Sequence, residues 1–251
     1  TKAMPKELLP IVDKPLIQYA VEEAIEAGIQ TLIFVTGRNK TAIEDHFDYR
    51  PELERLLQDQ GKHEQLQMIR NIIPENINCI FVRQAKPRGL GDAVYCARSA
   101  VGKEPFAVIL ADDFCSLQES NPTIDLINSF NLFRKNQISV MEVNGPEISN
   151  YGVVVPGKTE GKVQGLIEKP NYKSAPSNLA SIGRYVLNPE IFTILSNLGP
   201  GKGGEIQLAD ALNELARKEK IGAVPLRSKR FDCGTIDGFI EAINFEYNRR
   251  K

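Results

Sequence analysis

Short apolar segments alternate with amphipathic ones over residues 1–143, and this alternation constrains the fold more than any other feature. The runs Thr31–Gly37, Asn78–Arg83 and Phe106–Ala111 are short and rich in β-branched or aromatic residues, which is typical of buried strands. Apolar residues recur at helical spacing between such runs and before the first, as in Leu16–Ala27, where Gly28 suits a helix end. The pattern predicts an α/β fold with a mostly parallel sheet covered by helices on both faces.

The pattern of apolar and turn residues changes after residue 144. YGVVVPG, KVQGLIEKP and ASIGRYVLN are strand-like pieces separated by turn residues, which predicts antiparallel hairpins. Helices are expected at 189–195 and 205–218, and a last helix is expected to run to Asn248. The chain shows no internal repeat and no linker, so we expect a single domain, 1–251, whose two halves meet at 143/144.

The charge balance argues against partners that need a basic surface. The chain has 31 Lys and Arg residues against 32 Asp and Glu, a formal net charge of −1. Proteins that bind nucleic acid rely on a surplus of basic residues, so we expect no such partner. No apolar run approaches the roughly 20 residues that cross a bilayer, and no secretory leader opens the sequence, so we expect no membrane partner.

Cysteine and histidine usage narrows the possible chemistry. No Cys-X-X-Cys pair occurs among the four cysteines, which are Cys79, Cys96, Cys115 and Cys233. We therefore expect neither a zinc–thiolate site nor a disulfide framework. We expect reduced thiols, as in a cytoplasmic protein. The only histidines are His46 and His63, which disfavours a histidine base. The groups that remain available for catalysis are carboxylates, lysines, backbone amides and a hard metal ion.

The segment PKELLPIVDKP contains the first candidate residue, Lys6. Prolines flank this lysine, so we expect a rigid, non-helical segment. A lysine on a rigid loop near strand ends can meet phosphate as a point charge. The alternative is a solvated lysine in a surface loop.

The segment RQAKPRGLGDA follows an expected strand and opens an expected helix. Gly89 and Gly91 would allow the backbone to approach a ligand closely. Gln84 carries both a donor and an acceptor, so it can read an amide-like base edge. A plain strand–helix turn is the alternative.

Two aspartates, Asp112 and Asp113, directly follow the run Phe106–Ala111. Ligands of open α/β sheets bind at the carboxyl ends of strands. Hard oxygen donors there favour Mg²⁺, which shares its coordination with substrate phosphates. In the alternative, one aspartate caps the next turn and the other is solvated.

Four further acidic or basic residues stand at the ends of expected elements. Glu168 and Lys169 end a strand and project to opposite faces, so only one would face a cleft; a salt-bridged strand end is the alternative. Glu205 is expected in the first turn of a helix, where a carboxylate can also serve as a cap. Asp232 stands beside Gly234 at a strand–helix junction, and its alternative role is to cap the last helix.

The order of these segments resembles the bacterial UTP–glucose-1-phosphate uridylyltransferases, also called UDP-glucose pyrophosphorylases, over essentially the whole chain. PKELLPIVDKP, APSNLASIGRYVL and GGEIQLADAL are specific to this family, whereas EKP marks only the wider sugar-nucleotidyltransferase group. The resemblance implies a nucleotide-diphospho-sugar transferase fold: a Rossmann-like, mostly parallel central sheet with helices on both faces and a small antiparallel β portion on the sugar side. Residues 1–143 would form the nucleotide-binding half, and 144–251 the sugar-binding half.

The resemblance carries the family's nucleotide-side roles to five residues of this chain. Lys6 matches the lysine that contacts the nucleotide phosphates, and Gln84 and Gly89 match the pair that recognises uracil. Asp112 and Asp232 match the two carboxylates that hold Mg²⁺, the expected cofactor.

The sugar-side roles fall on the second half of the chain. Gly152, Glu168 and Glu205 match positions that hold the glucose hydroxyls. Lys169 matches the lysine on the sugar phosphate. Arg184 lies in one of the family-specific strings and is assigned no contact.

The implied reaction is in-line attack of glucose 1-phosphate on the α-phosphorus of UTP, which gives UDP-glucose and pyrophosphate. Lys6, Lys169 and Asp112 would be catalytic, with Mg²⁺ bridging both reacting phosphates. We expect a cytoplasmic homo-oligomer, a dimer or a tetramer. The alternatives are a related transferase that uses dTTP or another sugar 1-phosphate, and a non-catalytic nucleotide-binding regulator on the same fold.

The sequence departs from the family pattern at three places. The family's glycine-rich loop ending in GTR would stand immediately before Thr1 and is absent from the sequence. GLGDA has Asp92 where the family more often has histidine. The loops around Asn144–Ser149 and Gly157–Lys162 are short for the family.

Overall fold

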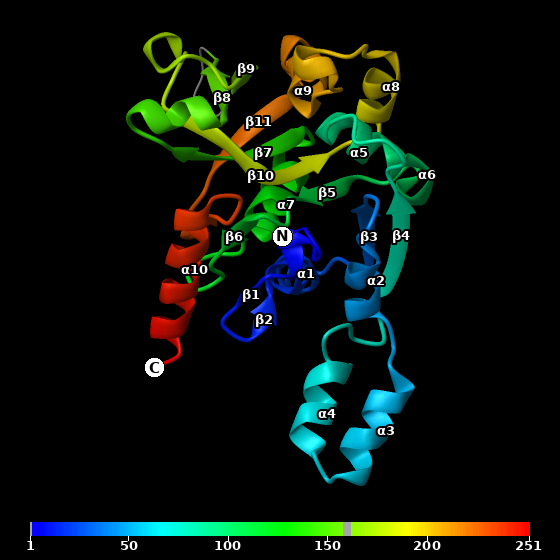
Figure 1. Cartoon of the computed structure of the whole chain (residues 1–251). Helices are drawn as coiled ribbons and strands as arrows, with labels where there is room; N and C mark the ends of the chain where they lie inside the picture. Colours follow the sequence, from blue (N-terminus) through cyan, green and yellow to red (C-terminus); the bar gives the residue numbers. More distant parts are fainter. Residues whose placement is uncertain (1, 158–161) are drawn as a thin grey trace.

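A six-stranded sheet lies at the centre of the computed structural model, which describes residues 2–157 and 162–251 (Figure 1). Its strands, in hydrogen-bonded order, are β11 (Ile221–Pro225), β7 (Asn136–Glu142), β10 (Leu179–Leu187), β8 (Gly152–Pro156) and β9 (Val163–Glu168), and β5 (Phe106–Ile109) also pairs with β10. The sheet therefore joins strands from both halves of the chain.

Strand β10 runs in the opposite direction to its neighbours. It is antiparallel to β5, β7 and β8, whereas β7 and β11 are parallel, so β5, β7 and β11 share one direction. Another parallel pair is formed by β3 (Thr31–Thr36) and β4 (Asn78–Arg83). The predicted α/β fold is confirmed, and its sheet is mixed because of β10.

The first part of β10 pairs with β8, and its last part pairs with β5. Ala180 and Ser181 pair with residues of β8, whereas Arg184–Leu187 pair with residues of β5. β8 and β9 form an antiparallel hairpin, as predicted for the region after residue 144. Residues 158–161, within a loop that we expected to be short, lie outside the described residues.

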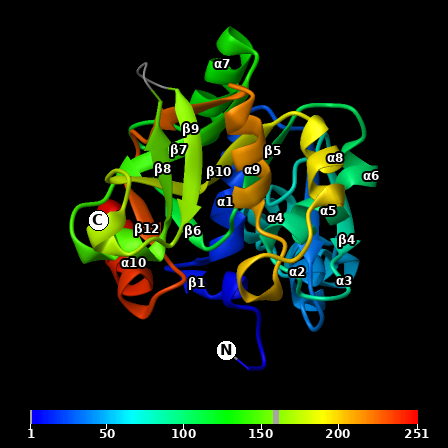
Figure 2. The same cartoon turned by 90° about the horizontal axis from the view of Figure 1, so that it is seen from above.

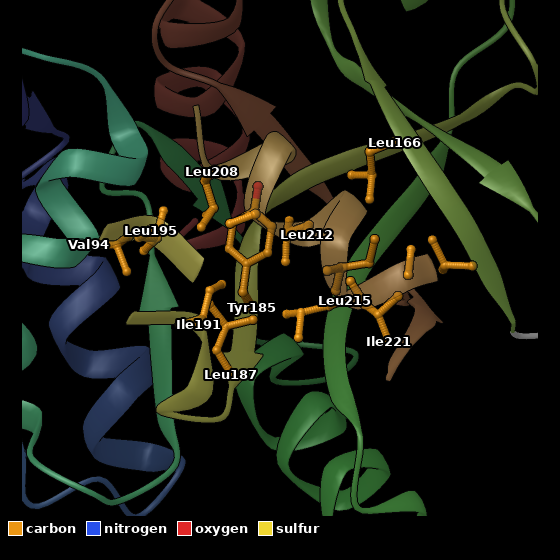
Figure 3. Close-up of a cluster of buried hydrophobic side chains, with 14 of the residues drawn as sticks. Val94, Leu166, Tyr185, Leu187, Ile191, Leu195, Leu208, Leu212, Leu215 and Ile221 are labelled. Carbon is orange, nitrogen blue, oxygen red and sulfur yellow. The ribbon is translucent and has the colours of Figure 1, made fainter. Parts of the chain in front are cut away.

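Helices cover both faces of the sheet. On one face lie α5 (Leu90–Cys96), α8 (Glu190–Asn197) and α9 (Leu208–Arg217), and on the other lies α7 (Pro122–Phe133). Successive residues of β10 alternate between these faces. Tyr185 and Leu187 pack in the apolar cluster under α5, α8 and α9 (Figure 3), whereas Val186 packs against Leu126 and Phe130 of α7. Because side chains of a strand alternate in direction, both faces of β10 are apolar and buried.

Residues 51–73 contain two helices rather than one continuous helix. α3 (Pro51–Asp59) and α4 (His63–Arg70) are separated at Gly61, whose φ of +67° lies in the left-handed region. A helix cannot continue through that conformation, and glycine adopts it most readily. The resulting hairpin projects away from the sheet (Figure 1).

The remaining elements are short or peripheral to the sheet. The helices are α1 (Leu16–Glu26), α2 (Thr41–Phe47), α6 (Arg98–Val101) and α10 (Ile236–Arg249). The strands are β1 (Pro10–Ile11), β2 (Lys14–Pro15), β6 (Asp113–Cys115) and β12 (Arg230–Asp232). The 3-10 turns are η1 (Lys6–Leu8), η2 (Pro146–Asn150), η3 (Tyr172–Ser174) and η4 (Lys202–Gly204). Figure 2 shows β12 beside α10, which follows it in the chain.

A buried ion pair joins α1 to β10. The guanidinium of Arg184 donates to both carboxylate oxygens of Glu23, with its Nη2 2.8 Å from Oε2, and the two side chains are 1% and 2% exposed. Arg184 also donates to the backbone oxygens of Leu110 and Asp113, at 3.1 and 2.7 Å. Thr123, at the start of α7, donates to Glu23 at 2.6 Å.

The strand β5 differs from the sequence-based prediction in burial and length. It was predicted to be buried and to continue to Ala111, but its residues are half-buried and it ends at Ile109. Leu110 N still donates to Gly183 O of β10 at 2.8 Å, and Asp113 N donates to Leu110 O at 3.3 Å across a tight turn. Asp112 therefore stands within this turn.

Within the described ranges, no helix combines the length and apolar character that a membrane span requires.

Arg184→Met should lower the free energy of unfolding by about 3–5 kcal/mol, because it leaves the Glu23 carboxylate buried without its counter-charge. The control is Lys220→Met, which removes an exposed pair with Glu190 and should cost no more than about 1 kcal/mol. Urea unfolding of both variants measures the difference. Equal losses would show that the buried pair is not a principal support of the fold.

Candidate active site

Two of the predicted carboxylates lie together: Asp112 is in the turn between β5 and β6, and Asp232 is the last residue of β12. β6 pairs with β12 so that Asp113 stands opposite Asp232, and Cys233 N donates to Asp112 O at 2.9 Å. A Cβ placed on Gly234 would lie 2.9 Å from Asp232 Oδ1 and 3.7 Å from Asp112 Oδ2. The glycine thus leaves open a small space that both carboxylates border.

Lys6 contacts one member of this pair, Asp112, directly. Its Nζ lies 2.7 Å from Asp112 Oδ2, with the two side chains 46% and 36% exposed. Partial burial alone would lower the pKa of Lys6, but the hydrogen bond to Asp112 and the charges of Asp112, Glu7 and Asp232 raise it above its ordinary value. The lysine is therefore a stable cation beside two anions. Its segment, expected to be non-helical, forms the 3-10 turn η1.

The side chain of Asp113 is held by hydrogen bonds inside the protein and does not face the open space. It is buried, and it accepts hydrogen bonds from Arg230 Nε at 2.6 Å and from Gly183 N at 2.9 Å. Arg230 also donates to the Tyr151 hydroxyl at 3.0 Å and lies 3.5 Å from Asp232 Oδ2. Arg230 was not predicted from the sequence, although a charged residue beside the core residue Phe231 in a short strand was a signal of a buried partner.

The alternative role for Asp232, capping the last helix, is wrong. Thr235 is the N-cap of α10, and its Oγ1 accepts from Gly238 N at 3.1 Å. Asp232 Oδ1 instead accepts from Gly234 N at 3.0 Å, within the turn before the helix. Its second carboxylate oxygen, Oδ2, contacts only the nearby Arg230 within the described part of the chain.

Gln84 and Gly89 form a compact loop after β4. Gln84 Nε2 donates to Gly89 O at 3.1 Å and to Asp92 Oδ2 at 2.8 Å. Gly89 precedes α5 with a φ of +99°, a conformation that favours glycine. Asp92, the departure from the family pattern, is thus the direct partner of the residue expected to recognise uracil.

The loop before α9 packs tightly on this glycine. Ile206 N donates to Arg88 O at 2.7 Å, and Gly91 N donates to Ile206 O at 2.9 Å. A Cβ at Gly89 would lie 2.7 Å from Ile206 O and 2.9 Å from Glu205 Cβ. Residues expected to hold the base and the sugar therefore meet here.

The predicted position of Glu205 in a helix is wrong. α9 begins at Leu208, and Glu205 has an extended backbone (φ −101°, ψ 150°) after the turn η4. Its side chain is exposed, and Oε2 accepts from Gln207 Nε2 at 2.9 Å. The backbone bonds of Ile206 to the Gly89 loop hold this segment extended, so the helix starts only beyond it.

Gly152, Glu168 and Lys169 stand together at one end of the β8–β9 hairpin. Gly152 pairs with Glu168 in the register, and a Cβ on the glycine would lie 3.2 Å from Glu168 Oε2. Lys169 has a φ of +46°, unusual for a residue with a side chain, and its N donates to Tyr151 O at 3.0 Å. Within residues 2–157 and 162–251 neither Glu168 nor Lys169 forms an ion pair, so the salt-bridged strand end is not observed.

Contacts join the predicted residues into three groups. The first is Lys6 with Asp112 and Asp232, the second is the hairpin end with Lys169, and the third is the loop contact between Gly89 and Glu205. Tyr151 connects the first two groups: its hydroxyl binds Arg230, and its carbonyl accepts from Lys169. Carboxylate, lysine and amide groups of this kind suit a phosphorylated ligand.

The oxygen donors at Gly234 fit a magnesium ion better than a transition metal. Mg²⁺ is held by one or two carboxylates and completes its shell with water and phosphate oxygens. Asp112 and Asp232 supply two such carboxylates. In the part of the chain that the structure describes, no cluster of three His, Cys, Asp or Glu residues could hold a metal.

Comparison with known proteins agrees with this geometry. The model of the family described as Nucleotidyl transferase matches residues 1–249. The chain belongs to this nucleotidyl transferase family. It is 46% identical to the UTP–glucose-1-phosphate uridylyltransferase of Pseudomonas aeruginosa over 98% of this chain and 90% of that protein. It is 48% identical to that of Bacillus subtilis, over 96% and 82%.

A solved structure supports the same relationship for this nucleotidyl transferase. A UDP-glucose pyrophosphorylase complexed with UDP-glucose superimposes with a TM-score of 0.89 and 45% identity, covering 99% of this chain and 92% of that one. The resemblance to bacterial UTP–glucose-1-phosphate uridylyltransferases is confirmed.

Gly89→Ala should destabilise this transferase more than Gly102→Ala does. Both glycines have positive φ, which costs roughly 1–2 kcal/mol for alanine, but only Gly89 would also press a Cβ against Ile206 and Glu205. Gly102 has open space around the added Cβ and is the matched control. Urea unfolding measures both, and equal losses would mean that the two loops are not tightly packed.

Proposed function

We propose that the protein transfers UMP from UTP to α-D-glucose 1-phosphate, with release of pyrophosphate and formation of UDP-glucose. The observation that carries the proposal is the contact of Lys6 with Asp112 beside Asp232, in a chain of the nucleotidyl transferase family. The named activity of the relatives and the UDP-glucose bound to a similar structure support the same reaction.

In the proposed reaction, a phosphate oxygen of glucose 1-phosphate forms a bond to the α-phosphorus of UTP as the bond to pyrophosphate breaks. Both reactants are anions, so catalysis depends on positioning them and offsetting their repulsion. Lys6 would hold the nucleotide phosphates and Lys169 the sugar phosphate. Gln84 and Gly89 would bind the uracil, and Gly152, Glu168 and Glu205 the glucose hydroxyls.

The chain's own groups suit direct transfer without a covalent intermediate. Cys233 is the thiol next to Asp232, and burial raises its pKa to about 12. A thiol with that pKa is protonated at neutral pH and is a poor nucleophile. In the proposed reaction the attacking group is the sugar phosphate.

Asp112 and Asp232 would hold Mg²⁺ in the proposed site. When bound, the ion would neutralise negative charge on the reacting phosphates. Lys6 pairs with Asp112 in this structure, so its ammonium is already placed against the same carboxylate. We also expect a cytoplasmic homo-oligomer.

The decisive assay is pyrophosphate release by the full-length protein, with glucose 1-phosphate and each of UTP, dTTP, ATP and CTP. UTP should exceed ATP and CTP by at least about 100-fold, because a site built to hydrogen-bond one base rejects a mismatched one. Thymine presents the same edge, so partial use of dTTP is compatible with the proposal. Tight binding of UTP without pyrophosphate release would favour the regulator. A faster reaction when galactose 1-phosphate replaces glucose 1-phosphate would favour a transferase for another sugar 1-phosphate.

Asp112→Asn and Asp232→Asn should each retain the fold and lower kcat by about 100-fold or more, because both carboxylates would contact the metal. Binding of Mn²⁺, followed by electron paramagnetic resonance, should weaken in the same variants. Asp125→Asn is the control, since Asp125, in the first turn of α7, pairs with the exposed Arg227 and is not a proposed metal ligand. Near-normal turnover and Mn²⁺ binding in both variants would reject the metal site.

A further inference from the structure

The side-chain amide of Gln84 is held in one orientation. Its Nε2 lies 3.1 Å from Gly89 O and 2.8 Å from Asp92 Oδ2. A backbone carbonyl and a carboxylate only accept hydrogen bonds, so both partners require the NH₂ end of the amide. A flipped amide would place Gln84 Oε1 against two acceptors and lose both hydrogen bonds.

Asp92 is itself fixed in place. It is buried at 2% exposure in the first turn of α5, where a negative charge is favourable. Its Oδ1 accepts from Arg88 Nη2 at 2.6 Å, while Oδ2 remains for Gln84. Arg88 is mostly exposed and has no contact with Gln84 itself within the described residues.

The consequence is that Gln84 keeps its acceptor end available. Among the residues that the structure describes, none donates to Gln84 Oε1, and none accepts from Gly89 N. Gln84 and Gly89 are half-buried, and they thus offer an acceptor and a backbone donor that these described residues do not use. An acceptor with a neighbouring donor complements a ring N–H flanked by a carbonyl.

We propose that Asp92 is a positioning residue that determines base specificity by locking Gln84 with Oε1 presented to the base. Uracil and thymine have an N–H at position 3, which this oxygen can accept. Cytosine has a lone pair at the same position and would meet it with repulsion. The inference rests on the proposed uridylyltransferase function and explains what the aspartate of GLGDA does in this chain.

A purely structural role for Asp92 makes a different prediction. If its purpose were the ion pair that orders the loop, removal of Arg88 would disturb the loop as much as removal of the carboxylate. If its purpose is to orient Gln84, only changes at Asp92 alter the preference between bases. Arg88→Gln is therefore the matched control, because it removes one contact of Asp92 and leaves Oδ2 on Gln84.

The test compares kcat/KM for UTP and for CTP in the wild type, Asp92→Asn, Asp92→Leu and Arg88→Gln. Asparagine is isosteric and can donate to Gln84 Oε1, so it permits the flipped amide, whereas leucine removes the polar partner. The ratio of UTP to CTP should fall about tenfold or more in both Asp92 variants, as expected when a fixed hydrogen-bond complement is lost. Arg88→Gln should stay within about threefold of the wild type.

A binding measurement without the sugar phosphate separates base recognition from chemistry. Titration calorimetry with UDP and with CDP should show the same loss of preference in the Asp92 variants. Unchanged ratios in both Asp92 variants, or an equal fall in Arg88→Gln, would overturn the role of Asp92. A wild type that prefers UDP to CDP but releases no pyrophosphate would contradict the proposed function alone, and the binding arm would still test Asp92. A wild type without any preference for UDP over CDP would overturn the inference.

Discussion

Arg184 and Glu23 form an ion pair inside the molecule, and the site is built around it. Charges are costly to bury, and they are tolerated only when hydrogen bonds satisfy them. Here Arg184 binds both oxygens of Glu23 and the carbonyls of Leu110 and Asp113. Thr123 completes the partners of Glu23. One pair thereby connects α1, β10, the start of α7 and the turn after β5.

That turn is the part of the fold with the greatest consequence for function. The carbonyls that Arg184 binds belong to Leu110 and Asp113, on either side of Asp112. The neighbouring Asp113 side chain is neutralised by the second buried arginine, Arg230, and accepts from Gly183 N. Asp112 is left without such partners and points to Lys6. Arg184 thus holds the backbone of the turn and Arg230 holds the side chain of Asp113, so that Asp112 stays available.

Periodicity predicted most elements because it records which faces are buried. The strand Asn78–Arg83 was predicted with the bounds that the structure has, and the end of the first helix agrees within one residue. The errors fall where a tertiary contact overrides the local pattern. Glu205 has a sequence suited to a helix start, but Ile206 is bound to the Gly89 loop in an extended conformation. Glu23 is placed at i+7 from Leu16, on the buried face of α1, and this was a signal of a buried charge.

By itself the sequence determined the α/β class, the family, and the residue types available for chemistry, because these follow from patterning and from motifs read along the chain. Only the tertiary structure decided which of these residues meet. The pairing of β6 with β12 brings Asp232 to Asp112 across 120 positions of sequence, and β10 brings Arg184 to Glu23. It also decided that Asp92 orients Gln84, because the direction of an amide depends on which acceptors surround it in space.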